Sequence, residues 1–145
     1  MAPVRHKFFY PLQVRFADTD AQGHVFFGTY FTFFDEGLMA YMRHLGFPWK
    51  TLLEMGIETI YVDAHCQFNL PATVEESLHV HTRISRIGNS SFTSEFVIYK
   101  KEGQDVLVAT GHLTAVVVDS KSRRPVRMPE AIRTAVADYE GVTGY

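Results

Sequence analysis

Apolar and polar residues alternate at the start of the chain and again along most of its second half. From Phe8 to Phe16 an aromatic or aliphatic residue stands at every second position. The same period of two runs through 60–70, 78–84, 92–100 and 106–118. This period is typical of strands with one buried face. Short turn segments separate these strands, so the pattern predicts three consecutive hairpins, the first joining 60–70 to 78–84, and an antiparallel sheet.

The helical segments have a different pattern. Between Tyr30 and Leu45 apolar side chains cover nearly the whole helical circumference, which predicts a helix buried on most sides. Gly46 ends it, with Arg43 and His44 in its last turn. A short helix is expected over 48–55 and a terminal helix over 129–139. A sheet curled around one central helix, an α+β arrangement, is the architecture that fits this order.

Composition narrows the class of protein. The 145 residues suit one domain, 1–145, and 46% apolar with 14% aromatic residues excludes a disordered chain. A net charge of −2 gives no basic footprint for nucleic acid. The apolar run near the N-terminus is too short for a signal peptide or a membrane span, and Cys66 has no second cysteine to pair with. These features predict a cytoplasmic protein.

The loop between the first strand and the central helix carries the most specific motif. Residues 14–30 read VRFADTDAQGHVFFGTY, with Asp18 and Asp20 in an Asp-x-Asp-x-x-Gly-x-Val pattern. This stretch resembles the signature of the 4-hydroxybenzoyl-CoA thioesterase family, and the likeness continues through the Phe68-x-x-Pro71-Ala72 step and the 118–129 segment. The resemblance implies the hotdog fold, with five or six strands around one long helix. It also implies hydrolysis of an acyl-CoA to a free acid and CoA, with no organic cofactor and no metal.

Three residues take catalytic roles under this resemblance. Asp20 matches the family's catalytic aspartate, as nucleophile or as general base toward water. The amide of Phe27, together with that of Gly28, would polarise the thioester carbonyl, because a helix start presents unpaired N–H groups and a positive dipole end. Asp18 is interpreted as a turn former that bonds nearby backbone N–H groups.

Four further residues are expected to contact substrate: His24, Phe26, Thr29 and Tyr30. The aromatic ones suit an aromatic or medium-chain acyl group, although they are also good core residues. Many family members have His or Pro followed by Asn where this chain has Gly28 and Thr29. At this position Thr29 is interpreted as a cap of the central helix.

Other readings of the same residues stay open. A hotdog dehydratase or hydratase would use His24 with an acid, and a non-catalytic dimer would bind acyl-CoA without turnover. Glu36 occupies the helix in which other hotdog thioesterases place their carboxylate, but contact with solvent or a partner is the simpler explanation.

Several polar residues on the predicted strands remain to be placed. Asp63, His65, Gln67 and Asn69 share one strand face, which a solvated surface explains more simply than a dimer interface or an acyl cleft. His79 and His81 project to one side without an obvious third metal ligand. The cations available to CoA phosphates are Arg83, Arg86, Arg123, Arg124 and Arg127. Long strands with an open edge predict a homodimer, or a homotetramer built as a dimer of dimers.

Overall fold

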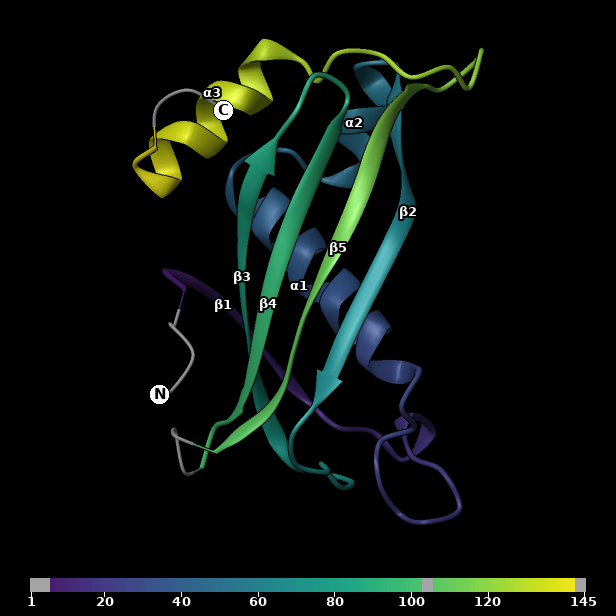
Figure 1. Ribbon diagram of the computed structural model, residues 1–145, viewed down its shortest axis with the longest axis vertical. Coiled ribbons are helices and arrows are strands. Elements are labelled where there is room, and N and C mark those ends of the chain that lie inside the picture. The colour runs from purple at the N-terminus through teal and green to yellow at the C-terminus, as the bar shows by residue number, and fades with distance from the viewer. Residues whose placement is uncertain (1–5, 103–105, 143–145) are drawn as a thin grey trace.

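The computed structural model describes residues 6–102 and 106–142 (Figure 1). Five strands and three helices follow each other along the chain, with one 3-10 turn. The strands are β1 (Phe8–Gln13), β2 (Ile57–Phe68), β3 (Ser77–Ile87), β4 (Ser91–Lys100) and β5 (Leu107–Asp119). The helices are α1 (Thr29–His44), α2 (Trp49–Glu54) and α3 (Glu130–Glu140), and the turn is η1 (Phe16–Asp18).

The five strands form one antiparallel sheet in the order β1-β3-β4-β5-β2, and α1 runs along one face of it (Figure 1). This helix touches all five strands. Irregular pairing in β2, β3 and β5 accompanies the bend of the sheet around the helix. The predicted α+β arrangement around a central helix is therefore confirmed.

One predicted connection is wrong. The strand over 60–70 does not form a hairpin with the next strand, because β2 pairs with β5 and lies at the sheet edge, while β3 pairs with β1 and β4. The segment 69–76 instead crosses the end of the sheet. The amides of Asn69 and Leu70 donate to the Val108 carbonyl, and that of Glu75 donates to the Val14 carbonyl. Alternation fixes which face of a strand is buried but not which strand lies beside it, so the pattern could not show this crossover.

Helix α1 is buried on most sides, as its composition predicts. Tyr30, Phe33, Phe34, Leu38 and Tyr41 are almost inaccessible to solvent. The exposed positions of the helix include Thr32, Glu36, Arg43 and His44. Leu45 caps its C-terminus, followed by Gly46 with φ +95°, a conformation that glycine adopts without strain. None of the described helices is long and apolar enough to cross a membrane.

Gly111 on β5 lies beneath a large aromatic side chain of the central helix. The Phe34 ring stacks on Phe96 with ring centroids 4.6 Å apart, over the β5 position of Gly111. A β-carbon at that position would lie 2.3 Å from the His65 carbonyl oxygen and 2.5 Å from the Phe34 ring. The missing side chain therefore allows a large aromatic residue to pack against the strand.

Gly111→Ala is expected to destabilise the fold. The added methyl group must displace either the backbone of β2 or the buried Phe34 ring, and overpacking of this kind costs about 1–3 kcal/mol. Thermal and urea unfolding measure the loss. Gly88→Ala is the matched control, because a β-carbon there would approach mainly the flexible side chains of Ser91 and Arg86, at 3.1 and 3.2 Å. An unchanged midpoint in Gly111→Ala would contradict the close approach.

Strand β2 is an edge strand that exposes several large apolar side chains. It is 12 residues long and pairs with β5 on one side only, within the part of the chain that the structure describes. Ile60, Tyr61, Val62 and Phe68 expose between 37% and 60% of their surface. A long apolar edge is a site for pairing with a further strand. The predicted dimer through strand edges therefore has a suitable surface, although the assembly itself stays a prediction.

Candidate active site

The loop from η1 to α1 is folded back on itself as a short ladder. The Asp18 carbonyl accepts a hydrogen bond from the Phe26 amide at 2.9 Å, and the Asp20 amide donates to the His24 carbonyl at 2.9 Å. Between these two rungs Thr19 and Val25 form an antiparallel bridge. We call residues 18–20 the first arm and 24–26 the second arm of the ladder. Asp20 thus ends the first arm at a turn closed by Gly23, which has φ +80°.

Asp18 is a structural acid of this ladder. Its side chain is only 3% exposed, and it accepts hydrogen bonds from the Arg15 amide at 2.8 Å and from the Arg15 guanidinium at 2.8 and 3.2 Å. The side-chain hydrogen bond from Arg15 holds the pKa of Asp18 below its usual value, against the opposing effect of burial. The interpretation of Asp18 as a residue that bonds a nearby backbone N–H is confirmed.

Asp20 lines a cavity of about 300 Å³ beside the start of α1. One of its carboxylate oxygens, Oδ1, accepts the Gln22 amide at 2.9 Å, and the side chain is half-buried. The walls of this cavity, which we call the Asp20 cavity, come from the loop, from α1 and from the end of β2. Its lining residues are Asp20, Gln22, His24, Val25, Phe27, Tyr30, Phe68, Asn69, Leu70 and Pro71.

Among the described residues, two backbone amides at the start of α1 have no hydrogen-bond partner. Gly28 occupies the N-cap position, and the first amides of the helix that donate are those of Thr29, Tyr30 and Phe31, to the carbonyls of residues 26–28. Within the described residues, the amides of Phe27 and Gly28 donate to no carbonyl or side chain. Unpaired donors at a helix start lie in a region of positive potential. They are suited to an oxygen on which negative charge develops.

The cavity brings together four of the seven residues predicted for the site. Asp20, His24, Phe27 and Tyr30 all line it, whereas Phe26, Gly28 and Thr29 do not. The Phe26 ring packs on Phe27, with centroids 4.6 Å apart, so it contacts a lining residue without lining the cavity itself. The capping role of Thr29 is wrong, because Gly28 is the N-cap and no side chain caps the helix. Gly28 leaves room for the Phe26 ring, because a β-carbon at position 28 would lie 2.9 Å from that ring.

Sequence reasoning missed the contribution of the β2 end. Phe68 lies 5.5 Å from Tyr30 and 6.5 Å from Phe27 between ring centroids, and the three rings form an aromatic wall. Asn69, expected on a solvated strand face, also lines the cavity, while Asp63, His65 and Gln67 are exposed. The Phe68-x-x-Pro71 step could have indicated this contribution, because it is part of the resemblance to the 4-hydroxybenzoyl-CoA thioesterase family.

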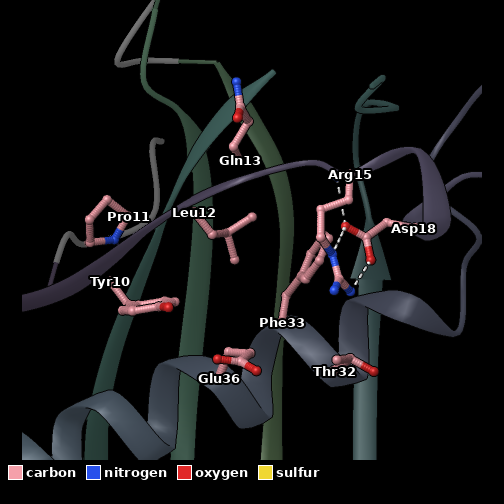
Figure 2. A pocket seen from close by; sticks show the side chains of 9 residues that line it. All are labelled: Tyr10, Pro11, Leu12, Gln13, Arg15, Asp18, Thr32, Phe33 and Glu36. Atoms are coloured by element: carbon pink, nitrogen blue, oxygen red, sulfur yellow. Dashed lines mark hydrogen bonds and ion pairs between the residues drawn. The ribbon is translucent and has the colours of Figure 1, made fainter. Parts of the chain in front are cut away.

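The other candidate residues lie elsewhere. Glu36 is exposed and lines a separate cavity of about 390 Å³ between β1 and α1, together with Asp18 (Figure 2). His79 stacks on Phe9, with ring centroids 4.4 Å apart. Over residues 6–102 and 106–142, no group of three acidic, His or Cys side chains could hold a metal ion. Arg83 pairs with Glu95, and Arg127 contacts Asn89 and Glu130.

Cys66 is a partly buried thiol on β2. Burial raises the pKa of this thiol to about 11. At pH 8 such a thiol carries roughly 100-fold less thiolate than one at the ordinary value of about 9, and the thiolate is the form that reacts. We therefore expect native Cys66 to react with a chromogenic disulfide reagent at least tenfold more slowly than in the urea-unfolded chain. Equal rates in the two states would show that the side chain is accessible.

The motif, the curled sheet and the cavity at the helix start can be compared with known proteins. The model of the thioesterase-like superfamily matches residues 14–136, which covers most of the chain. The chain belongs to the thioesterase-like superfamily. Its central helix inside a five-stranded antiparallel sheet is the hotdog fold, as the resemblance implied.

Individual members of the superfamily are similar over nearly their full length. An acyl-CoA thioesterase of Haemophilus influenzae, YbgC, is 26% identical over 133 residues, which are 88% of this chain and 93% of the relative. A 1,4-dihydroxy-2-naphthoyl-CoA hydrolase of a Synechococcus species is 30% identical, with 82% of each chain covered. A solved gentisyl-coenzyme A thioesterase superposes with a TM-score of 0.78 at 30% identity, over 90% of this chain and 99% of that one.

Proposed function

We propose that this superfamily member is an acyl-CoA thioesterase that uses Asp20 as its reacting carboxylate. The observation that carries the proposal is the juxtaposition of Asp20, in a cavity with an aromatic wall, with the two unpaired amides of Phe27 and Gly28. The names of the relatives support the reaction class. A thioester bound in this cavity would meet a base or nucleophile in Asp20 and hydrogen-bond donors for its carbonyl oxygen in the two amides.

Two routes are compatible with this arrangement. In the first, Asp20 attacks the thioester carbon, the carbon–sulfur bond breaks, and water hydrolyses the resulting mixed anhydride. In the second, Asp20 accepts a proton from a water molecule that attacks the same carbon. Both routes release CoA as a thiolate that takes up a proton from solvent. In both, the amides of Phe27 and Gly28 stabilise the charge that develops on the carbonyl oxygen.

A second copy of the chain would complete the site. If two β2 strands pair antiparallel about a twofold axis, the Phe68 end of one strand comes beside the Thr59 end of the other. A smaller apolar cavity of about 160 Å³ lies at that end, between α1, α2 and β2. We call it the apolar cavity; its lining residues are Asp35, Leu38, Met39, Met42, Trp49, Leu52, Thr59, Tyr61 and Phe92. In a dimer, the Asp20 cavity of one copy would continue toward the apolar cavity of the other.

This apolar cavity favours an aromatic acyl group. Trp49, Tyr61 and Phe92 contribute rings, and the Tyr61 hydroxyl donates to Asp35 Oδ1 at 2.6 Å. A flat apolar ring with a polar substituent suits such a lining. The acyl groups named for two relatives, 1,4-dihydroxy-2-naphthoyl and gentisyl, are aromatic. We therefore place aromatic acyl-CoAs ahead of medium-chain aliphatic ones, with the protein acting in the cytoplasm as a homodimer or homotetramer.

A panel of aromatic and aliphatic acyl-CoAs tests the proposal. Free thiol and free acid are measured together, and we expect equimolar release of both with the highest kcat/KM on aromatic thioesters. A change in the acyl chain with the thioester intact would favour the dehydratase or hydratase that uses His24. Tight binding of every acyl-CoA without any product would favour a binding dimer. Either result would overturn the thioesterase assignment.

A further inference from the structure

The first arm of the ladder, which carries Asp20, has almost no apolar anchor. Between Val14 and Val25 the one buried residue is Asp18, whereas Phe16 exposes 82% of its surface and Arg15 exposes 70% of its side chain. Burial of apolar side chains is the dominant favourable term that fixes a segment against a protein core. Here a charged side chain takes that place.

The two arms of the ladder are fixed in different ways. The second arm is tied to the segment that follows β2, because the Val25 amide donates to the Ala72 carbonyl at 2.8 Å and His24 bridges Thr73. Outside the loop, the first arm is tied only to Arg15, the residue after Val14, among the described residues. The Asp18 amide donates to the Arg15 carbonyl at 2.9 Å, and the Asp18 carboxylate accepts the amide and the guanidinium of Arg15 (Figure 2).

Asp18 is connected both to Asp20 and to the segment that carries the Phe27 amide. Asp20 follows it by two residues along the first arm. Across the ladder, the Asp18 carbonyl accepts the amide of Phe26, and the next amide is that of Phe27. A shift of Asp18 would therefore change the separation between the Asp20 carboxylate and the unpaired amides. Misplacement of reacting groups by about 1 Å can lower a rate by roughly 100-fold.

We propose that Asp18 is a positioning residue, which through its clamp on Arg15 holds Asp20 in register with the amides of Phe27 and Gly28. This inference rests on the proposed function of the Asp20 site. Asp18 itself does not line the Asp20 cavity; it faces the cavity between β1 and α1 (Figure 2). It acts on the rate through the loop, without touching the substrate.

Asp18→Asn tests the inference with little change in size. The amide oxygen can still accept the Arg15 amide, but the ion pair is lost and the new NH2 group cannot accept the second guanidinium hydrogen bond. We expect kcat to fall roughly 10- to 100-fold while KM changes by less than about threefold, because the loss concerns alignment and not substrate contacts. Hydrogen exchange of the amides in 18–28 should accelerate, and exchange in β4 should not.

Matched variants separate positioning from general stabilisation. Glu140→Gln makes the same kind of change on α3, where the Glu140 carboxylate accepts the Tyr41 hydroxyl at 2.6 Å, and should leave kcat unchanged. Arg15→Gln alters the exposed half of the clamp and keeps the backbone bond, so it decides the question even if Asp18→Asn fails to fold. It should lower kcat severalfold, with partial recovery in Arg15→Lys.

Two results would overturn the inference. One is a folded Asp18→Asn that melts earlier but keeps kcat within twofold of wild type, and the other is an Arg15→Gln with unchanged kcat. Either would show that the clamp only stabilises the fold. Failure of the proposed function gives a different pattern, since the wild-type protein would then release no thiol from any acyl-CoA.

Discussion

Asp20→Asn is expected to lower kcat for thioester hydrolysis by roughly 10²- to 10⁴-fold, the range usual for loss of an acid–base group. An amide neither attacks the thioester carbon nor accepts a proton from water, so both proposed routes fail. The fold should survive, because the Asn oxygen can still accept the Gln22 amide that Asp20 Oδ1 binds at 2.9 Å. Steady-state kinetics on the best aromatic acyl-CoA and a thermal melt measure the two effects.

Two control variants make this result specific. Asp138→Asn changes an exposed aspartate on α3, far along the chain from the loop, and should leave kcat unchanged. Glu36→Gln tests the rival carboxylate in the cavity between β1 and α1. If Glu36→Gln abolishes turnover and Asp20→Asn leaves kcat within a few-fold of wild type, the Asp20 assignment is wrong.

The local pattern predicted where the helices and strands lie along the chain, but it did not predict which strands pair with each other. The helix predicted over 30–45 is observed at Thr29–His44, and the short helix predicted over 48–55 at Trp49–Glu54. Helical and strand periods act over a few residues, so a single sequence contains them. The position of β2 beside β5 depends instead on contacts between residues 57–68 and 109–119. Alternation alone is equally compatible with a hairpin to β3, the connection that proved wrong.

The same distinction between local and long-range information applies to the residues of the candidate site. Asp20, His24, Phe27 and Tyr30 lie within one short motif, and the sequence predicted them together. Phe68 and Leu70 enter the cavity because the end of β2 meets the start of α1, which only the sheet order decides. The burial of Asp18 likewise depends on an ion pair with Arg15 that motif spacing does not show. Local sequence therefore predicted the candidate reacting residues, and the long-range topology supplied the walls of the cavity that they line.

A substitution that blocks pairing at the β2 edge is expected to have a large effect on both assembly and activity. Val62 lies in the irregular part of this strand and exposes 60% of its surface. A charge on an edge strand prevents pairing with a further strand. We expect Val62→Asp to convert a wild-type dimer or tetramer into a monomer or a dimer without β2 pairing, as measured by sedimentation velocity. Because the apolar cavity of the second copy would then be missing, kcat/KM on aromatic acyl-CoAs should fall roughly 100-fold or more.

Val142→Asp is the matched control for this change. It also places a charge on an exposed valine, 43% accessible, but beyond the end of α3 and outside the sheet. It should change neither the assembly nor the rate. A monomeric Val62→Asp with full activity would show that one chain holds a complete acyl site, and a wild-type monomer with full activity would show the same without any substitution. In either case the Asp20 cavity of a single chain would have to accommodate the whole acyl group, and its aromatic wall, not the apolar cavity, would determine which acyl groups bind.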